Sequence, residues 1–446
     1  MNKNVRKWAG AACLFAVAVS AQAGKYTFKV TNPVEGAKLT LTWNADGTEK
    51  TVTLTNGEGM IEVNGFNPQY VQMKYGRSSR TLFLEPDKDL QVSFDGETFY
   101  KNVDFAGDNA AVNRYLNTTQ FAKMNFTAAK RAEDAFLHSV DSVYQANMDA
   151  LNKAQLPENF TRQEQERLKY ASYALLPLYQ NYYKYLNNVA DFTPSDTYYA
   201  KLQELSPIDA SLMSYPEYRE FITNAVYANV LRMGNGDMDQ QFMDYLTAHV
   251  KDPKVLEYVT DAYIYDKVSR SGVDGAEALI DFYHKNVKDP ALTKRFDETC
   301  TQWEAVKAGQ PSPTFTCPDI NGKSVSLADL KGRYVYIDVW ATWCGPCRGE
   351  LPHLKKLEEA YAGKDIAFVS LSCDSNKAAW EKMVKDGDMK GIQLFMGPKD
   401  DFMDKFMITG IPRFILLDRE GKIVKADAPR PSEPSISKLF DELLTK

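Results

Sequence analysis

The stretch Arg333-Tyr-Val-Tyr-Ile-Asp-Val-Trp340 leads directly toward Trp343-Cys344-Gly345-Pro346-Cys347. The first part is almost continuously apolar, β-branched or aromatic, which predicts a strand buried on both faces. From Gly345 onward apolar side chains recur at helical spacing, at Leu351, Leu354, Leu357 and Tyr361. Cys344 is therefore expected where a helix begins, and the unpaired N–H groups and the helix dipole stabilise a thiolate there. The two cysteines are predicted to form a redox-active dithiol.

Two cysteines at this spacing also occur as half of a zinc site. However, the sequence has no second pair of Cys or His residues at zinc-ligand spacing, and Gly-Pro between the thiols suits a redox turn. The spacing favours redox chemistry, and no metal site is predicted. No Gly-x-Gly-x-x-Gly fingerprint occurs, so a bound nicotinamide or flavin cofactor is not expected either.

Residues 311–446 resemble the thioredoxin-like domain of the TlpA/ResA-type thiol-disulfide oxidoreductases. The resemblance rests on Pro313-Thr-Phe315, Asn321-Gly-Lys-Ser-Val-Ser-Leu327, Leu330-Lys-Gly332 and the Trp-Cys-Gly-Pro-Cys centre. It covers roughly the last third of the chain, the usual size of one domain. It implies an α/β thioredoxin-like fold for residues 310–446.

The same resemblance implies roles for three acids. Asp338 matches the buried carboxylate with which thioredoxins take the proton from the second cysteine, and Glu350 matches an acid beside that thiol in ResA-like proteins. Asp374 matches a further acid at the rim of the site, an auxiliary residue. Taken alone, Asp338 could face water on an edge strand, and Glu350 could be a favourable charge near a helix N-terminus. A buried carboxylate near the second thiol would instead have a raised pKa and keep Cys347 protonated until it reacts.

Gly410-Ile411-Pro412 precedes the apolar run Phe414-Ile-Leu-Leu417. In the family that this chain resembles, the proline follows a cis peptide bond and faces the dithiol. Sequence alone does not fix the isomer. Ile411, Pro412 and the motif residue Trp343 are expected to contact the substrate.

These features predict an enzyme, a thiol-disulfide oxidoreductase. The thiolate of Cys344 would attack a substrate disulfide, and Cys347, deprotonated by Asp338 or Glu350, would then release the reduced substrate. The Gly-Pro dipeptide and the acids favour a protein-disulfide reductase over a strong oxidant, and the resemblance suggests cytochrome maturation or envelope thiol repair. Two alternatives remain: a thiol peroxidase, and a partner-binding envelope protein with an auxiliary redox domain.

The first 23 residues indicate secretion. Lys3, Arg6 and Lys7 precede an apolar stretch over residues 9–19, and Ala21-Gln22-Ala23 has the small-x-small pattern of a cleavage site. We expect a periplasmic or envelope-associated protein without a membrane span after cleavage; an uncleaved anchor is the minor alternative. Removing three basic residues from 53 leaves 50 against 59 acidic ones, a net charge of −9, which argues against nucleic acid as a partner. The expected partners are disulfide-containing proteins and a membrane or periplasmic electron donor.

Three cysteines of the predicted mature chain lie outside the motif: Cys300, Cys317 and Cys373. Cys317 and Cys373 alternate with apolar residues, which favours two buried thiols that act as small hydrophobic side chains. The alternatives are a Cys317–Cys373 disulfide, or an auxiliary redox role for Cys373 beside Asp374. Cys300 receives no role.

The other two thirds of the chain predict a multidomain protein without evident chemistry. Residues 24–112 contain segments in which polar and apolar side chains alternate. These segments are separated by the turn signals Asp46-Gly47, Asn56-Gly57 and Asp95-Gly96, and the pattern predicts a small antiparallel β domain. Residues 113–309 change to helical periodicity and predict an α-helical domain. A capping box is expected at Thr161-Arg-Gln-Glu164, and helix starts at Asp252-Pro253 and Asp289-Pro290. Gln310-Pro311-Ser312-Pro313 is predicted to be the linker into the redox domain.

Overall fold

The computed structural model describes residues 24–234, 236–398 and 401–445. The predicted signal peptide, residues 1–23, lies outside them. By compactness the chain divides between Arg232 and Met233 into two units, which are described separately.

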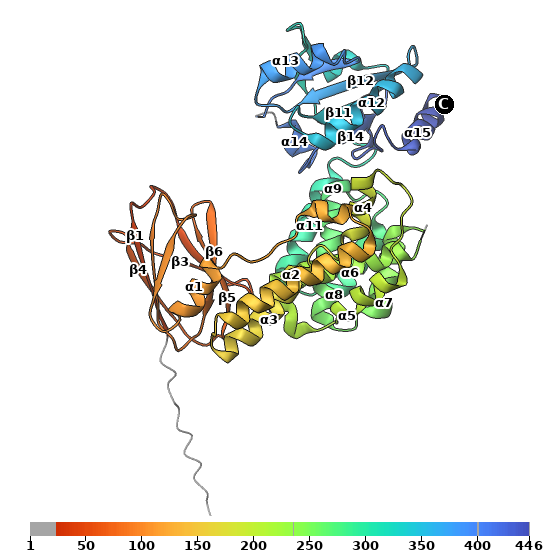
Figure 1. Cartoon of the computed structure of the whole chain (residues 1–446). Coiled ribbons are helices and arrows are strands. Elements are labelled where there is room, and N and C mark those ends of the chain that lie inside the picture. Colours follow the sequence, from red (N-terminus) through yellow and green to blue (C-terminus); the bar gives the residue numbers. More distant parts are fainter. Residues whose placement is uncertain (1–23, 235, 399–400, 446) are drawn as a thin grey trace, which may run out of the picture. The chain divides into compact units, whose positions relative to one another are not determined.

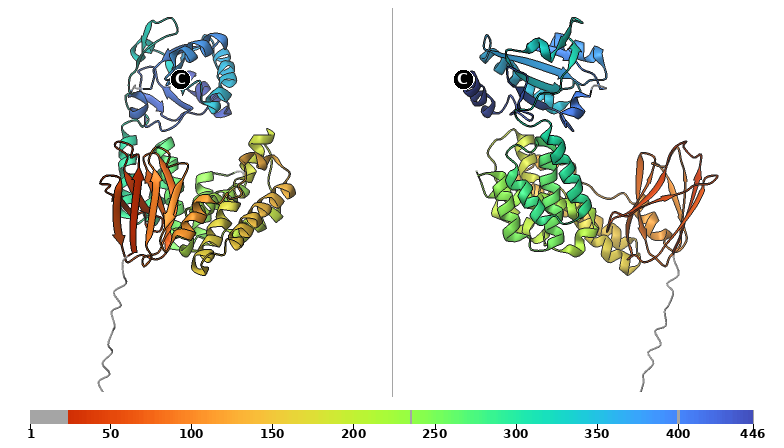
Figure 2. Two further views of the ribbon diagram at one scale, coloured as in Figure 1. Left: turned by 60° about the vertical axis from the view of Figure 1, so that its left-hand side comes forward. Right: turned by 180° about the vertical axis from the view of Figure 1, so that it is seen from behind.

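The first unit begins with two four-stranded sheets, with strand orders β4-β1-β7-β8 and β3-β2-β5-β6. The strands are β1 (Gly24–Thr31), β2 (Leu39–Trp43), β3 (Glu49–Val52), β4 (Glu58–Val63), β5 (Gln69–Tyr75), β6 (Ser78–Leu84), β7 (Leu90–Asp95) and β8 (Val103–Ala106). One apolar core takes side chains from both sheets, for example Phe28 of β1 and Leu41 of β2. The two sheets therefore pack face to face as a sandwich, the red-to-orange strands of Figure 2.

The expected turns form where the sequence placed them. Gly47 closes the β2–β3 hairpin, and Asn56 and Gly57 stand between β3 and β4; all three have positive φ. A Cβ on Gly57 would lie 2.3 Å from the carbonyl oxygen of Val30, so the close approach of β1 also requires glycine there.

The prediction that this domain is wholly antiparallel is wrong at one position. β1 pairs antiparallel with β4 on one side and parallel with β7 on the other, with Tyr26 opposite Leu90. Alternation of polar and apolar residues specifies which face is buried but not the direction of the neighbouring strand, and the long connection from β1 to β7 is what permits parallel pairing.

Helices follow the sandwich. In the first unit they are α1 (Ala110–Thr118), η1 (Phe126–Lys130), α2 (Glu133–Lys153), α3 (Glu158–Tyr173), α4 (Tyr179–Asn187), α5 (Asp196–Leu205), η2 (Ala210–Ser214) and α6 (Pro216–Arg232). The second unit opens with α7 (Met238–His249), α8 (Pro253–Thr260), η3 (Asp261–Tyr265), α9 (Asp266–Ser271), α10 (Glu277–Asn286) and α11 (Pro290–Glu304).

Two of the three predicted helix starts are confirmed. Asp252 and Asp289 each cap their helix by accepting hydrogen bonds from two backbone N–H groups, and proline follows at the first helical position. The capping box at Thr161 is wrong, because α3 begins earlier, at Glu158, and the Thr161 hydroxyl donates instead to the carbonyl of Leu156 at 3.2 Å.

The C-terminal part of the second unit is an α/β structure around a five-stranded sheet of order β13-β12-β11-β14-β15. Its elements are β9 (Thr316–Pro318), β10 (Ser324–Ser326), η4 (Leu327–Leu330), β11 (Tyr334–Trp340), α12 (Gly345–Ala360), β12 (Ile366–Ser372), α13 (Lys377–Asp386), β13 (Ile392–Phe395), α14 (Phe402–Lys405), β14 (Arg413–Leu417), β15 (Ile423–Lys425) and α15 (Pro434–Leu444). β11, β12 and β13 are parallel, and β14 and β15 run antiparallel to their neighbours. β11 is the central strand, as its apolar sequence predicts.

Both faces of this sheet are buried, and alternate residues of β11 serve different faces. Tyr334 and Tyr336 pack in one cluster with Leu354 of α12 and Phe440 of α15, whereas Val335 and Ile337 belong to another cluster. α12 and α15, which Figure 1 labels, therefore cover the face that carries the even-numbered residues of β11.

The segment Gln310–Pro313, predicted to be a linker, is bound to the end of this sheet. The N–H of Gly309 donates to the carbonyl of Ile423 at 2.7 Å, and the N–H of Ile423 donates to the carbonyl of Gln310 at 2.9 Å. Pro311 also forms a β-bridge with Lys422. The segment extends the edge beyond β15 rather than connecting two domains freely.

Candidate active site

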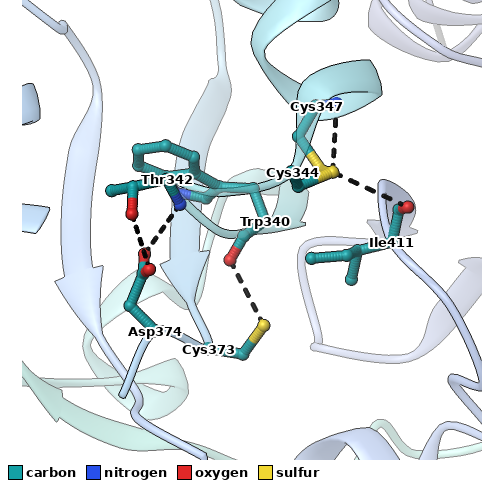
Figure 3. Close-up of a disulfide and its surroundings, with 7 residues drawn as sticks. All are labelled: Trp340, Thr342, Cys344, Cys347, Cys373, Asp374 and Ile411. Carbon is teal, nitrogen blue, oxygen red and sulfur yellow. Dashed lines mark hydrogen bonds between the residues drawn. A yellow bond between two sulfur atoms is a disulfide. The ribbon is translucent and has the colours of Figure 1, made fainter. Parts of the chain in front are cut away.

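The dithiol lies where β11 gives way to α12. Cys344 is the N-cap residue of α12, and its Sγ accepts a hydrogen bond from the backbone N–H of Cys347 at 3.2 Å (Figure 3). The two sulfur atoms are joined in a disulfide, and the side chains are 4 % and 2 % exposed. When the disulfide is reduced, a thiolate at Cys344 would keep this hydrogen bond and lie at the positive end of the helix dipole, and both effects favour the ionised form.

Ile411 and Pro412 lie beside Cys344. Their peptide bond is cis, as the resemblance implied, and the Sγ of Cys344 lies 3.8 Å from the carbonyl oxygen of Ile411 (Figure 3). Both residues are partly exposed, and the indole of Trp343 is 68 % exposed. Partly exposed apolar side chains therefore lie next to the Cys344 sulfur.

Asp338 is buried in the middle of the central strand. It is 4 % exposed, and its Oδ1 has no hydrogen-bond partner among the described residues. Burial, followed by the negative charges of Glu350 and Glu358, raises the pKa of Asp338 to about 8. The alternative of a water-facing residue on an edge strand is wrong, because β12 and β14 flank β11.

Glu350 lies in the second turn of α12 and is 9 % exposed. Its carboxylate accepts two hydrogen bonds from Ser432, one from the backbone N–H at 3.0 Å and one from the hydroxyl at 2.9 Å. Glu350 is therefore buried and held by Ser432, in addition to lying near the N-terminus of α12. Its charge acts on Asp338, so the two predicted acids share one electrostatic environment.

Asp374 is 1 % exposed, so it lies inside the domain and not at a rim. It accepts hydrogen bonds from the N–H of Thr342 at 2.9 Å, from the Thr342 hydroxyl at 2.7 Å and from the Ser372 hydroxyl at 2.8 Å (Figure 3). Asp374 thus fastens the residues just before the motif to the end of β12. Both oxygens of Asp374 accept these hydrogen bonds, so the residue is suited to positioning the segment before the motif.

Cys373 is partly buried, and its Sγ donates to the carbonyl of Trp340 at 3.4 Å (Figure 3). Burial, and secondly the charge of Asp374, raise the pKa of the Cys373 thiol, which disfavours an auxiliary nucleophile at neutral pH.

The alternative of a Cys317–Cys373 disulfide is wrong, because neither residue is disulfide-bonded and they pack in different apolar clusters. Cys317 is buried, as the apolar alternation around it predicts. Burial also raises the pKa of the Cys300 thiol, to about 11.

Three residues of the site were not identified from the sequence: Thr342, Ser432 and Glu358. Ser432 lies 82 positions from Glu350, and nothing local marks it as a partner. Only its spacing points to Glu358, which follows Glu350 and Leu354 at four-residue steps and so shares their helix face.

No helix within the described ranges is both long and apolar enough to cross a membrane. In the same ranges no group of three or more His, Cys, Asp or Glu side chains is arranged to hold a metal ion.

Comparison with known proteins agrees with this geometry. The Redoxin family model matches residues 307–443. Thiol-disulfide oxidoreductase ResA of Bacillus cereus is 32 % identical over 123 residues, which are 27 % of this chain and 70 % of that protein. ResA of Bacillus subtilis is 28 % identical over 122 residues, 27 % of this chain and 68 % of that protein.

Solved structures match the same region. One from Bacteroides vulgatus, provisionally assigned as a thiol-disulfide oxidoreductase, is 66 % identical and covers 32 % of this chain and 93 % of its own, with a TM-score of 0.29. The thioredoxin domain of a second B. vulgatus thiol-disulfide oxidoreductase is 31 % identical. The match covers 31 % of this chain and 98 % of that domain, with a TM-score of 0.29.

The sheet order and the matched families confirm the thioredoxin-like fold expected for the C-terminal domain. The chain therefore belongs to the ResA-type family of thiol-disulfide oxidoreductases.

Proposed function

We propose that this protein is a periplasmic or envelope reductase of protein disulfides, with Cys344 as the attacking cysteine and Cys347 as the resolving one. The observation that carries the proposal is the position of Cys344 at the N-cap of α12, where its sulfur accepts a hydrogen bond from the Cys347 N–H. On the strand that leads to this motif, the buried carboxyl of Asp338 has a pKa of about 8.

The reaction begins with the reduced dithiol. The Cys344 thiolate attacks one sulfur of the substrate disulfide, a mixed disulfide forms, and the other substrate sulfur leaves as a thiolate that takes a proton from solvent. Cys347 then gives its proton to Asp338, and its thiolate attacks the Cys344 sulfur. The Cys344–Cys347 disulfide forms and the second substrate thiolate leaves, so the substrate gains the two electrons that the dithiol loses.

Glu350 is the second candidate for this proton transfer, but Ser432 occupies both of its oxygens. Asp338 keeps Oδ1 without a partner, which favours it as the direct acceptor. A carboxylate with a pKa near the working pH is also suited to exchanging protons with a thiol.

The proposed location rests on the basic, apolar and small-x-small pattern of residues 1–23. Each turnover as a reductase leaves the Cys344–Cys347 disulfide behind, and an oxidising compartment does not reduce it, so an electron donor of the membrane or periplasm is needed. The proposed substrates are proteins with accessible disulfides, docked against Trp343, Ile411 and Pro412.

The test is a Cys347→Ser variant of the full chain, expressed in a bacterial envelope and analysed on non-reducing gels. The expected result is a set of mixed disulfides that all pass through Cys344, because the resolving thiol is missing. Cys373→Ser is the matched control and should trap nothing. Trapped adducts through Cys373, or none at all, would overturn the proposal.

The direction of the reaction has its own measurement. The reduction potential of the dithiol should lie closer to that of thioredoxin, about −270 mV, than to that of the oxidant DsbA, about −120 mV. A peroxidase would instead consume peroxide with Cys344 as its reactive thiol, which the same purified protein can be assayed for.

A further inference from the structure

Three polar side chains form a row across the parallel part of the C-terminal sheet. Asp338 of β11 stands opposite Ser370 of β12, and Ser370 stands opposite Gln393 of β13. They are 4 %, 2 % and 6 % exposed. Asp338 and Ser370 alternate in register with Tyr336 and Phe368, so the row lies on the face covered by α12.

This row has unused hydrogen-bonding capacity. The Nε2 of Gln393 donates to the carbonyl oxygen of Lys390 at 2.6 Å and to the Ser370 hydroxyl at 3.4 Å, which leaves the hydroxyl hydrogen of Ser370 available for another acceptor. Asp338 Oδ1 and Gln393 Oε1 both lack a partner among the described residues. Buried polar atoms without partners are rare in native proteins, and they call for water or a functional role.

The far end of the row meets a carboxylate. A Cβ on Gly391 would lie 2.6 Å from Glu358 Oε1 and 3.0 Å from the carbonyl oxygen of Phe368, so the Glu358 side chain lies over the junction of β12 and β13. Beside it is a cavity of about 430 Å³, lined by Glu358 and Gln393 with Leu351, Leu354, Met383 and Met389. The cavity therefore touches the last member of the row and the Glu358 carboxylate.

We propose that Glu358 is the group through which Asp338 exchanges its proton with solvent, by way of Ser370, Gln393 and water that enters the cavity beside α12. The inference rests on the proposed function, in which Asp338 accepts the proton of Cys347. The proton that Cys347 loses would leave through the flank of the domain while the bound substrate covers the dithiol.

Charges on every neighbouring element fit this role. Asp338 faces Glu350 and Glu358 from α12 and Tyr336 on its own strand. Glu358 faces Glu359 and Lys355 on its own helix and Lys390 before β13, and Asp388 contacts both lysines. Burial, followed by the charge of Glu359, raises the pKa of Glu358 to about 7. The two carboxyls thus titrate in the same range, and the charge of Glu358 disfavours ionisation of Asp338.

The test compares Glu358→Gln with Glu359→Gln in the full chain, since the neighbouring Glu359 is exposed and is not among the charges acting on Asp338. Release of substrate from the Cys344 mixed disulfide is timed across pH 5–10 with a fluorescently labelled protein disulfide. Glu358→Gln should move the midpoint of the profile to lower pH, on the order of half a unit, because one negative charge near Asp338 is removed. Glu359→Gln should move the midpoint much less, because Glu359 acts on Glu358 and not directly on Asp338.

Two further variants separate a proton path from a general change of structure. Ser370→Ala should slow the release of substrate roughly tenfold, a smaller effect than the loss of a direct general base would have. The midpoint of the pH profile should stay where it is in the wild type. In an Asp338→Asn background, Glu358→Gln should have no further effect on the profile. The titration of Asp338 in the oxidised protein, followed by ¹³C NMR, should shift with Glu358→Gln by the same amount and requires no activity.

The inference is overturned if the wild-type chain releases substrate normally and Glu358→Gln behaves like Glu359→Gln, or if the Glu358→Gln shift persists in the Asp338→Asn background. A wild-type chain that cannot release substrate would overturn the proposed function instead. In that case the NMR titration still decides whether Glu358 controls Asp338.

Discussion

Asp374 binds Thr342 through both the backbone N–H, at 2.9 Å, and the hydroxyl, at 2.7 Å. This pair joins the end of β12 to the residue that precedes Trp343 and Cys344. The position of the reactive sulfur therefore depends on an acid whose oxygens are directed to Thr342 and Ser372.

Replacing this acid should loosen the segment before the dithiol. Asp374→Ala leaves the partly buried N–H and hydroxyl of Thr342 and the buried hydroxyl of Ser372 without their acceptor, and we expect a loss of about 2 to 3 kcal/mol in the free energy of unfolding. Urea unfolding of the oxidised chain measures it. Asp386→Ala, at an exposed position on α13, is the control and should leave the unfolding midpoint unchanged. Equal midpoints for the two variants would contradict the role of Asp374.

Asp338→Asn should change how stability depends on pH. The pKa of Asp338 is raised in the folded protein to about 8, above its usual value of about 4, so its contribution is fully present below about pH 4 and is lost as pH rises through 8. The asparagine variant lacks this loss. At pH 9 it should be more stable than the wild type by about 2 to 5 kcal/mol, and the difference should shrink toward pH 5.

Guanidinium unfolding of both oxidised proteins at pH 5, 7 and 9 checks this expectation. The same variant should lose most of the pH dependence of substrate release, because the proton acceptor is absent. Stability curves that run parallel across this range would rule out a titrating Asp338.

Trp343→Ala should affect substrates and not the fold. The indole is 68 % exposed, so its removal should change the free energy of unfolding by no more than about 0.5 kcal/mol. The value of kcat/KM for a protein disulfide should fall about tenfold, whereas a small disulfide should react almost normally, because only the protein reaches the indole. An equal loss for both substrates would indicate that Trp343 positions the dithiol instead.

A fourth prediction concerns the first unit, where Glu164 is completely buried. It accepts hydrogen bonds from Tyr70 at 2.5 Å and from Arg167 at 2.7 Å, and Arg167 also reaches Glu217 at 3.1 Å. Arg167→Met would leave a buried carboxylate uncompensated, with an expected cost of about 3 to 5 kcal/mol.

Arg270→Met removes the exposed pair with Asp266 and serves as the matched control, with an expected cost below about 1 kcal/mol. Denaturant unfolding of the full chain compares the two. Equal losses for the two variants would contradict the role of Arg167 as the buried partner of Glu164.

Much of the redox domain could be predicted because its signals are local. The apolar run of β11 specifies a buried central strand, and the helical spacing after Gly345 places Cys344 at a helix start, as the structure has it. Burial of Asp338 is favoured over a water-facing position because Tyr336 and Trp340, two residues away on either side, are apolar and share its face of the strand.

The rest depends on partners that are distant in the sequence. Ser432, in a loop before α15, donates hydrogen bonds to Glu350. Glu358 lies close to Gly391, which directly precedes β13, so its surroundings depend on how the sheet assembles. Thr161 resembles a helix cap locally, but the helix starts earlier and the hydroxyl bonds backward to Leu156. Neither tertiary hydrogen bonds nor strand direction can be read from periodicity.

The parallel pairing of β1 with β7 affects how the sandwich can assemble. β1 lies inside its sheet, yet its two partners are made later, β4 ending at Val63 and β7 ending at Asp95. Until those residues are available, a strand with one apolar face presents two unpaired edges that other chains can join. Fragments that stop before Asp95 should therefore aggregate more readily than the whole chain, because β1 then lacks its parallel partner β7.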